Sequence, residues 1–187
     1  TALGLPVWDK WDNKLYNCAA IIQKGEILGL IPKVYLPNYG EFYELRHFTP
    51  APEENRTVSF CGQPCPFGKK LLFSCETMED FVLGVEICED LWVPSPPSVN
   101  LALAGATVLC NLSASDETVG KDAYRRELVN GQSARLLCGY IYASAGDGES
   151  TQDVVYSGHN VIAENGHILK ESERFGSGVI CTEIDVK

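Results

Sequence analysis

Short apolar runs separated by turn residues begin this chain, and they predict strands rather than helices. Residues 1–7 and 16–22 are two such runs. Lys24 and Gly25 supply a hairpin turn into a third run over residues 26–32. The sequence therefore predicts that the chain opens with strands joined by tight turns, and that residue 1 already lies within a strand.

The next forty residues have less periodicity. Residues 33–44 are dense in aromatic residues and turn formers, which indicates an ordered loop leading to a short helix. Residues 49–68 are rich in proline and are expected to be loop, with one short strand over residues 57–60. Any chemistry in this part of the chain would therefore be carried by loops.

Strands and helices alternate in the middle of the chain. Strands are predicted over 70–74, 80–87, 107–112 and 139–145, and helices over 98–104 and 122–137. The second of these strands is nearly continuous in apolar residues, as buried strands are. In the longer helix the expected apolar positions are Ala123, Leu128, Ala134 and Leu137.

The last third returns to short strands, predicted over residues 157–163, 168–173 and 178–185, with Asn165 and Gly166 as a hairpin turn. Strands interleaved with helices in the middle, and hairpins at both ends, indicate an α/β fold of the layered α+β kind. There is no internal repeat and no linker, so residues 1–187 are expected to form one domain.

Composition narrows the class of protein. The chain has 187 residues, 45% of them hydrophobic, which suffices for one buried core. Its 25 acidic and 15 basic residues give a net charge of −10 without a clustered basic stripe, which argues against nucleic acid or an anionic membrane as a partner. No apolar run approaches the ~18 residues of a membrane helix, and no signal peptide is present, so a cytoplasmic location is expected.

The eight cysteines allow two interpretations, four disulfides or reduced thiols. Most lie in or beside apolar segments and no secretory segment is present, which favours reduced core cysteines. Cys61 and Cys65 could bind zinc only with two further ligands, and the three histidines are scattered. No metal site is therefore expected.

Cys88 lies where the buried strand over residues 80–87 ends, in the sequence EICEDLW. The carboxyl ends of strands commonly carry reactive groups in α/β folds. The neighbouring carboxylates would raise the pKa of the thiol, so a nucleophilic Cys88 needs a cation from elsewhere in the chain. From its local sequence alone, a core cysteine is the favoured interpretation of Cys88.

Lys33 is a candidate for that cation. It follows an apolar strand directly and is surrounded by aromatic residues, so it could project into a pocket as an oxyanion donor. Glu41, eight residues further on, could pair with it. Without a pocket, both would be ordinary surface charges. The polar residues 111–115 end a second buried strand, which is either an ordinary strand exit or part of the same site.

The two candidate segments together resemble a known family. KVYLPNYGE, which begins at Lys33, and EICEDLW around Cys88 are similar to segments of the nitrilase superfamily of carbon–nitrogen hydrolases. The similarity is greatest to the glutaminase domains of glutamine-dependent NAD⁺ synthetases. Supporting segments are 103–108, 111–115, 124–127 and 140–146. The resemblance covers the chain from about Gly4 to its end, and it implies an α-β-β-α four-layer sandwich.

The resemblance implies roles for particular residues. Cys88 would be the nucleophile, Lys33 the cation that stabilises the tetrahedral oxyanion with the backbone N–H of Glu89, and Glu41 a further glutamate that arranges the site. Glutamine would be recognised by Tyr39, Glu89, Trp92, Ser115 and Lys121. An acid such as Glu89 suits the α-ammonium group of glutamine, and Lys121 suits its α-carboxylate.

The chain also departs from the family pattern. No residue before Lys33 matches the general-base glutamate of the family, and no ATP-binding glycine motif is found. We therefore expect an N-terminally truncated glutaminase domain with little activity by itself. ATP and Mg²⁺ would bind only to an absent C-terminal synthetase domain, the expected partner.

Two other functions remain open from the sequence: a free-standing amidase for another small amide, and a catalytically dead binding or scaffold domain. A chain lacking its first strand–helix units would expose apolar sheet surface, so homo-oligomers are also expected.

Overall fold

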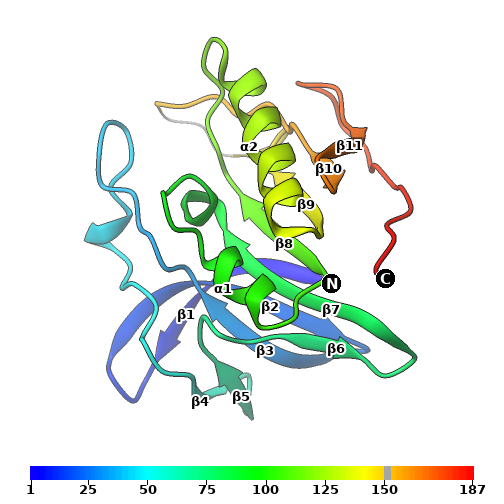
Figure 1. Cartoon of the computed structure of the whole chain (residues 1–187). Coiled ribbons are helices and arrows are strands. Elements are labelled where there is room, and N and C mark those ends of the chain that lie inside the picture. Colours follow the sequence, from blue (N-terminus) through cyan, green and yellow to red (C-terminus); the bar gives the residue numbers. More distant parts are fainter. Residues whose placement is uncertain (150–152) are drawn as a thin grey trace.

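The computed structural model describes residues 1–149 and 153–187, and its first five strands form one sheet, here called sheet A (Figure 1). These strands are β1 (Ala2–Asp9), β2 (Lys14–Gln23), β3 (Glu26–Pro32), β4 (Arg56–Phe60) and β5 (Gln63–Phe67). They lie in the order β1-β2-β3-β5-β4. β1 to β3 form an antiparallel meander, because each connection is a tight turn.

The second sheet, sheet B, contains β6 (Phe73–Cys75), β7 (Met78–Ile87), β8 (Val108–Ser113), β9 (Gly139–Ser144), β10 (Val161–Glu164) and β11 (His167–Glu171). Its order is β11-β10-β9-β8-β7-β6. β7, β8 and β9 are parallel and are connected by α1 (Pro97–Leu103) and α2 (Lys121–Leu136). Two short 3₁₀ helices complete the fold, η1 (Glu44–Arg46) and η2 (Cys88–Leu91).

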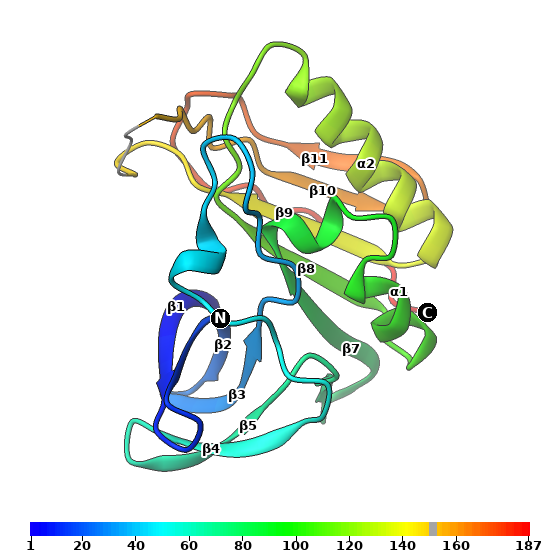
Figure 2. The ribbon, with the colours of Figure 1, turned by 90° about the vertical axis from the view of Figure 1, so that its left-hand side faces the viewer.

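The elements pack in layers (Figure 2). Both helices cover one face of sheet B, over a core that includes Leu101, Leu109 and Val129. The other face of sheet B packs on sheet A, where Ile21 and Ile31 meet side chains of β7. Successive residues of β2 face opposite sides of sheet A, and both sides are buried, which explains its nearly continuous apolar run.

Sheet A has a second core on its outer side, formed by alternate residues of its own curled strands, among them Tyr16, Leu30 and Phe67. Within residues 1–149 and 153–187 no helix covers that side. The layered α/β fold predicted from the sequence is confirmed, and the described residues form three of the four layers of an α-β-β-α sandwich. The two 3₁₀ helices, η1 and η2, belong to loops and not to a layer.

One strand was missed by the sequence prediction. β5 contains Pro64 and Pro66, and prolines cannot donate to a sheet ladder. Both stand at exposed positions, whereas Cys65 and Phe67 alternate with them and face the core. The strand pairs along β4 and meets β3 at only one residue pair.

The predicted strand over residues 178–185 is wrong. This segment is without regular structure and runs beside sheet B, where Ile184 packs over Gly139 and the Asp185 N–H donates to Glu164. The predicted strand over 157–163 begins only at Val161.

The expected apolar face of α2 is also wrong. Ala123, Ala134 and Leu137 are exposed, and only Leu128 packs against the core. The buried residues of the helix are Arg125, Val129, Gln132 and Ser133. Three of these four are polar and have hydrogen-bond partners inside the protein, so apolar periodicity could not find the buried face.

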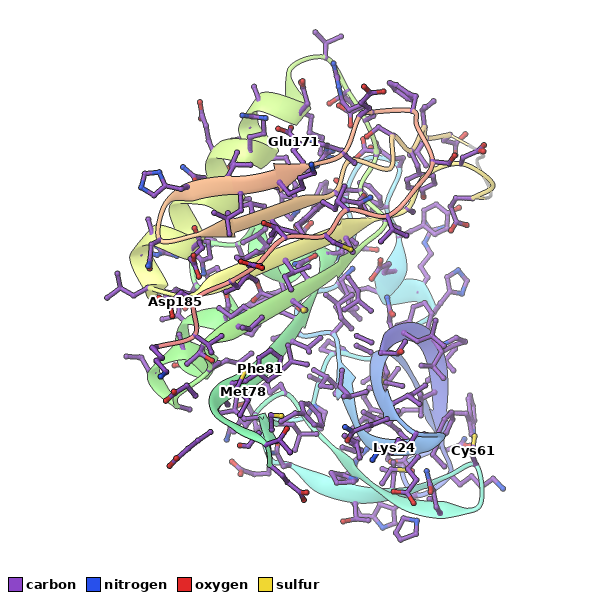
Figure 3. The ribbon with its side chains drawn as sticks, turned by 90° about the vertical axis from the view of Figure 1, so that its right-hand side faces the viewer. Lys24, Cys61, Met78, Phe81, Glu171 and Asp185 are labelled. Atoms are coloured by element: carbon purple, nitrogen blue, oxygen red, sulfur yellow. The ribbon has the colours of Figure 1, made fainter. Side chains whose placement is uncertain are left out.

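All eight cysteines lie within the described residues and all are free thiols, so none is joined in a disulfide. Cys61 is exposed at the turn between β4 and β5, at the same end of sheet A as Lys24 and far from Glu171 on β11 (Figure 3). Cys65 is buried in the outer core of sheet A. Among the described residues, no helix is long and apolar enough to span a membrane.

Candidate active site

Cys88 stands at a sharp turn between β7 and η2. Its φ is 46°, in the left-handed region that residues other than glycine rarely adopt. Asn111 of β8 holds this turn from the neighbouring strand. Its Oδ1 accepts the Cys88 N–H at 3.1 Å, and its Nδ2 donates to the Cys88 carbonyl at 3.3 Å. The thiol is half-buried at the carboxyl end of the parallel strands.

Lys33 directly follows β3 and is 1% exposed. Its backbone is fixed on both sides, because its N–H donates to the Asn17 carbonyl and its carbonyl accepts the Ala51 N–H. Its Nζ donates to both carboxylate oxygens of Glu44, at 2.9 Å to Oε1 and 2.8 Å to Oε2. A buried ammonium needs such a partner, since an unpaired charge in the interior is very costly.

The partner of Lys33 corrects the sequence interpretation. Glu41, which was expected to pair with it, is exposed and does not line the cavity described below. Glu44 occupies that place at the first position of η1. The turn at Gly40 (φ 57°) and the following short helix bring Glu44, and not Glu41, back toward β3. Spacing along the chain alone could not distinguish the two.

Asp90 joins the segment of Lys33 to the segment of Cys88. Its carboxylate accepts the N–H groups of Val34 and Tyr35, which follow Lys33, and the N–H of Ile87, which precedes Cys88. Burial raises the pKa of Asp90 to about 7, although hydrogen bonds from Tyr35 and Ile87 act in the opposite direction. In the sequence, Asp90 is only one of the carboxylates that neighbour Cys88.

A cavity of about 80 Å³ opens beside Cys88. All five residues predicted to recognise the substrate line it, together with Glu44: Tyr39, Glu89, Trp92, Ser115 and Lys121. They come from the loop after β3, from η2, from the loop after β8 and from the start of α2. Lys33 reaches this cavity through Glu44, which both binds its ammonium and lines the wall.

Two pairs of side chains fix the polar walls. The Tyr39 hydroxyl donates to Glu89 Oε1 at 2.8 Å, and burial, with this bond, raises the pKa of Tyr39, so that its hydroxyl stays protonated. Lys121 pairs with Asp116, and its Nζ lies 5.2 Å from the centre of the Trp92 ring. The cavity thus has an anionic and a cationic wall within one small space.

Two larger cavities, of about 470 and 460 Å³, lie on either side of α1. The first contains Lys69 and Lys70, but each pairs with an exposed glutamate, Glu53 or Glu54. Size therefore does not select the functional site here. The smaller cavity is the better candidate because it combines a thiol with fixed charges of both signs.

Within residues 1–149 and 153–187, no group of three or more His, Cys, Asp or Glu side chains could hold a metal ion. His159 and Glu171, which lie close together, take part in a buried ion-pair network with Arg125 instead.

Comparison with known proteins defines the class. The family model of the carbon–nitrogen hydrolases matches residues 1–187, and the chain belongs to this family. It is 50% identical over 174 residues to the glutamine-dependent NAD(+) synthetase of Mycobacterium tuberculosis. This match covers 93% of this chain and 26% of that protein. The corresponding enzyme of Saccharomyces cerevisiae is 32% identical over 184 residues, covering 92% of this chain and 25% of its own length.

Solved structures agree with this assignment. A crystal structure of a glutamine-dependent NAD(+) synthetase from Cytophaga hutchinsonii matches with a TM-score of 0.79 and 33% identity, covering 92% of this chain and 27% of that one. Nit3 of Saccharomyces cerevisiae, a nitrilase-superfamily member, has the same fold at 20% identity and a TM-score of 0.64; the match covers 91% of this chain and 54% of that one. The chain spans about a quarter of the length of the curated relatives it matches, and the family resemblance predicted from the sequence is confirmed.

Proposed function

We propose that this chain is the glutamine-hydrolysing part of a glutamine-dependent NAD⁺ synthetase and that Cys88 is its nucleophile. One observation carries the proposal: Cys88 lines a cavity whose walls offer a fixed carboxylate and a fixed ammonium. That pair is complementary to the two charges of a free amino acid. The names of the relatives supply the amide, glutamine.

The reaction divides into two steps. The Cys88 sulfur attacks the carboxamide carbon of glutamine, the C–N bond breaks, and the thiol proton leaves with the nitrogen as ammonia. Water then attacks the resulting thioester, which releases glutamate and returns a proton to the sulfur. Both steps pass through a tetrahedral oxyanion.

Lys33 is proposed to stabilise that oxyanion together with the backbone N–H of Glu89. Two of the three N–H bonds of its ammonium are directed at Glu44, and the third is proposed to reach the substrate. Glu44 takes over the arranging role that the sequence suggested for Glu41. It keeps the buried ammonium charged and correctly placed, so the donor needs no reorganisation during the reaction.

Recognition is proposed to use the polar walls of the cavity. Glu89, held by Tyr39, binds the α-ammonium group, and Lys121, held over Trp92, binds the α-carboxylate. Ser115 is 3% exposed and lies in the loop after β8, where its hydroxyl can meet the bound amino acid. An amide without the two α-groups would make neither of these contacts and would bind poorly.

The ammonia is proposed to pass to a C-terminal synthetase domain, which would bind ATP and Mg²⁺ and amidate nicotinic acid adenine dinucleotide. Residues before Lys33 contain no counterpart of the general-base glutamate of the family. We therefore propose that residues 1–187 alone hydrolyse little or no glutamine. Comparing ammonia release by this chain and by the full-length protein tests that point.

The main experiment uses the full-length protein and a Cys88→Ala variant. NAD⁺ formation is measured with glutamine or with ammonium chloride as nitrogen source. Cys88→Ala should lose the glutamine-dependent reaction by more than 1,000-fold, because the nucleophile is gone, and keep the ammonium-dependent one. A glutamine-analogue electrophile should modify Cys88 of the unaltered protein, as read by peptide mass spectrometry.

Other results would reject the proposal. Equal loss with both nitrogen sources would assign Cys88 a structural role, and labelling of a different cysteine would move the nucleophile. Rapid hydrolysis of a simple amide such as propionamide, with none of glutamine, would instead indicate an amidase.

A further inference from the structure

Asn111 is a buried polar residue to which the proposed chemistry assigns no role. It lies on β8 beside Glu86 of β7, in the parallel register of the two strands, and its side chain is fully buried. A buried amide is tolerated only when its donors and acceptors are paired. Its side chain hydrogen-bonds both the N–H and the carbonyl of a single residue, Cys88.

This contact acts on a strained point of the backbone. Cys88 has a φ of 46°, and such a conformation is strained for a residue with a side chain. It persists only where the surroundings determine it. As the first residue of η2, Cys88 also has an N–H without a partner in its own helix, and Asn111 Oδ1 supplies the acceptor.

The orientation of the Asn111 amide is itself fixed. Burial raises the pKa of the neighbouring Glu86, against hydrogen bonds from Tyr140, Ser98 and Asn111 that lower it. Tyr140 donates to Glu86 Oε1, and the Ser98 N–H donates to Glu86 Oε2 at 2.8 Å. With its NH₂ group toward an acid, Asn111 turns its oxygen to the Cys88 N–H, so the flipped amide is disfavoured.

We propose that Asn111 is a positioning residue that holds Cys88 in its left-handed conformation and so aims the sulfur at the substrate carbon. The proposal rests on the proposed function, in which Cys88 is the nucleophile. Glu86 and Tyr140 act through Asn111 by fixing the orientation of its side-chain amide. The Cys88 turn, Asn111 and the acid form one connected unit across β7, β8 and β9.

The test compares Asn111→Ala with Asn160→Ala in the full-length protein. Asn160 is a matched control, because its Oδ1 also accepts a backbone N–H, that of Ser144 at 2.8 Å, away from Cys88. For Asn111→Ala, kcat for ammonia release should fall about 100-fold, the loss expected when a reacting atom is misplaced by about 1 Å. KM for glutamine should stay within about threefold of the wild-type value, and Asn160→Ala should leave kcat within about threefold too.

A crystal structure of Asn111→Ala gives a readout that needs no substrate: φ of Cys88 should leave the left-handed region. If this variant does not unfold cooperatively, Asn111→Asp replaces it. That change keeps the acceptor for the Cys88 N–H but removes the donor to the Cys88 carbonyl, and it should lower kcat at least tenfold. The proposal is overturned if Cys88 keeps its conformation without Asn111, if kcat stays within threefold, or if Asn160→Ala loses as much.

Failure of the proposed function and failure of the proposed role of Asn111 would give different results. If the wild-type protein does not hydrolyse glutamine, the proposed function is wrong, and the Cys88 conformation in the variant still decides the role of Asn111. If wild-type activity is present and the variants keep it, only the role of Asn111 is wrong.

Discussion

The role of Glu44 follows from its position in the folded protein and not from its position in the sequence. In the sequence it is one of two acids in the aromatic loop over residues 33–44, and the other, Glu41, is nearer to Lys33 along the chain. In the structure it is the residue whose two carboxylate oxygens bind the Lys33 ammonium. Cys88 lines the candidate cavity and Lys33 reaches it through Glu44, whereas the choice of carboxylate required the turn before η1.

Glu44→Gln should lower kcat for glutamine hydrolysis about 100-fold in the full-length protein, because a neutral amide leaves the buried Lys33 ammonium uncompensated and poorly placed. KM should change less than kcat. Glu41→Gln, an exposed change of the same kind three residues away, should alter kcat less than about twofold. Steady-state ammonia release measures both variants. A larger loss in Glu41→Gln than in Glu44→Gln would return the role to Glu41.

At the scale of elements, the site is made where three segments end. Lys33 directly follows β3, Cys88 directly follows β7, and Ser115 lies in the loop after β8. Asp90 in η2 connects the first two segments through backbone N–H groups, so the relative position of lysine and cysteine depends on one buried carboxylate. Apolar runs located the strands well, because β3, β7 and β8 are buried in the middle of their sheets.

Asp90 should make the stability of the protein depend on pH. Its pKa is about 7 in the folded protein, against an ordinary value of 3.8, so the folded state binds this proton more tightly. The resulting stabilisation is complete below about pH 4 and is lost as pH rises through 7. Between pH 5 and pH 8 the stabilisation lost amounts to about 3 kcal/mol.

The Asp90→Asn variant has no carboxyl group to titrate at this position. Its unfolding free energy should therefore change less between pH 5 and pH 8 than that of the wild type. Urea denaturation at each pH measures the difference. Asp80→Asn, an exposed change on β7, should keep the wild-type profile. Parallel profiles for wild type and Asp90→Asn would contradict the raised pKa.

At the scale of the whole molecule, a buried ion-pair network joins α2 to β11 and to two neighbouring loops. Arg125 is fully buried; it donates to Glu117 at 3.0 Å and to His159 Nδ1 at 2.8 Å, and His159 Nε2 faces Glu171 at 2.5 Å. Burial, followed by the charge of Arg125, lowers the pKa of His159. A neutral His159 can therefore accept from Arg125 and donate to Glu171.

Arg125→Met should destabilise the protein by about 3–5 kcal/mol, because it leaves the carboxylate of Glu117 buried without its main cation. Arg126→Met changes the next residue of the same helix, whose guanidinium is 44% exposed and pairs with Glu171. It should cost less than about 1 kcal/mol. Urea denaturation of both variants gives the comparison, and similar losses would show that the network adds little.

The sequence by itself determined the layered α/β class, most strands, the family, and six of the residues that line the candidate cavity, Cys88 and the five predicted to recognise the substrate. It could do so because apolar periodicity and short motifs are local signals. Only the tertiary structure decided the buried face of α2, the missing pairing of residues 178–185, the partner of Lys33 and the contact of Asn111 with Cys88. Each of these depends on which polar groups meet across distant segments once water is excluded, and no spacing along the chain encodes that.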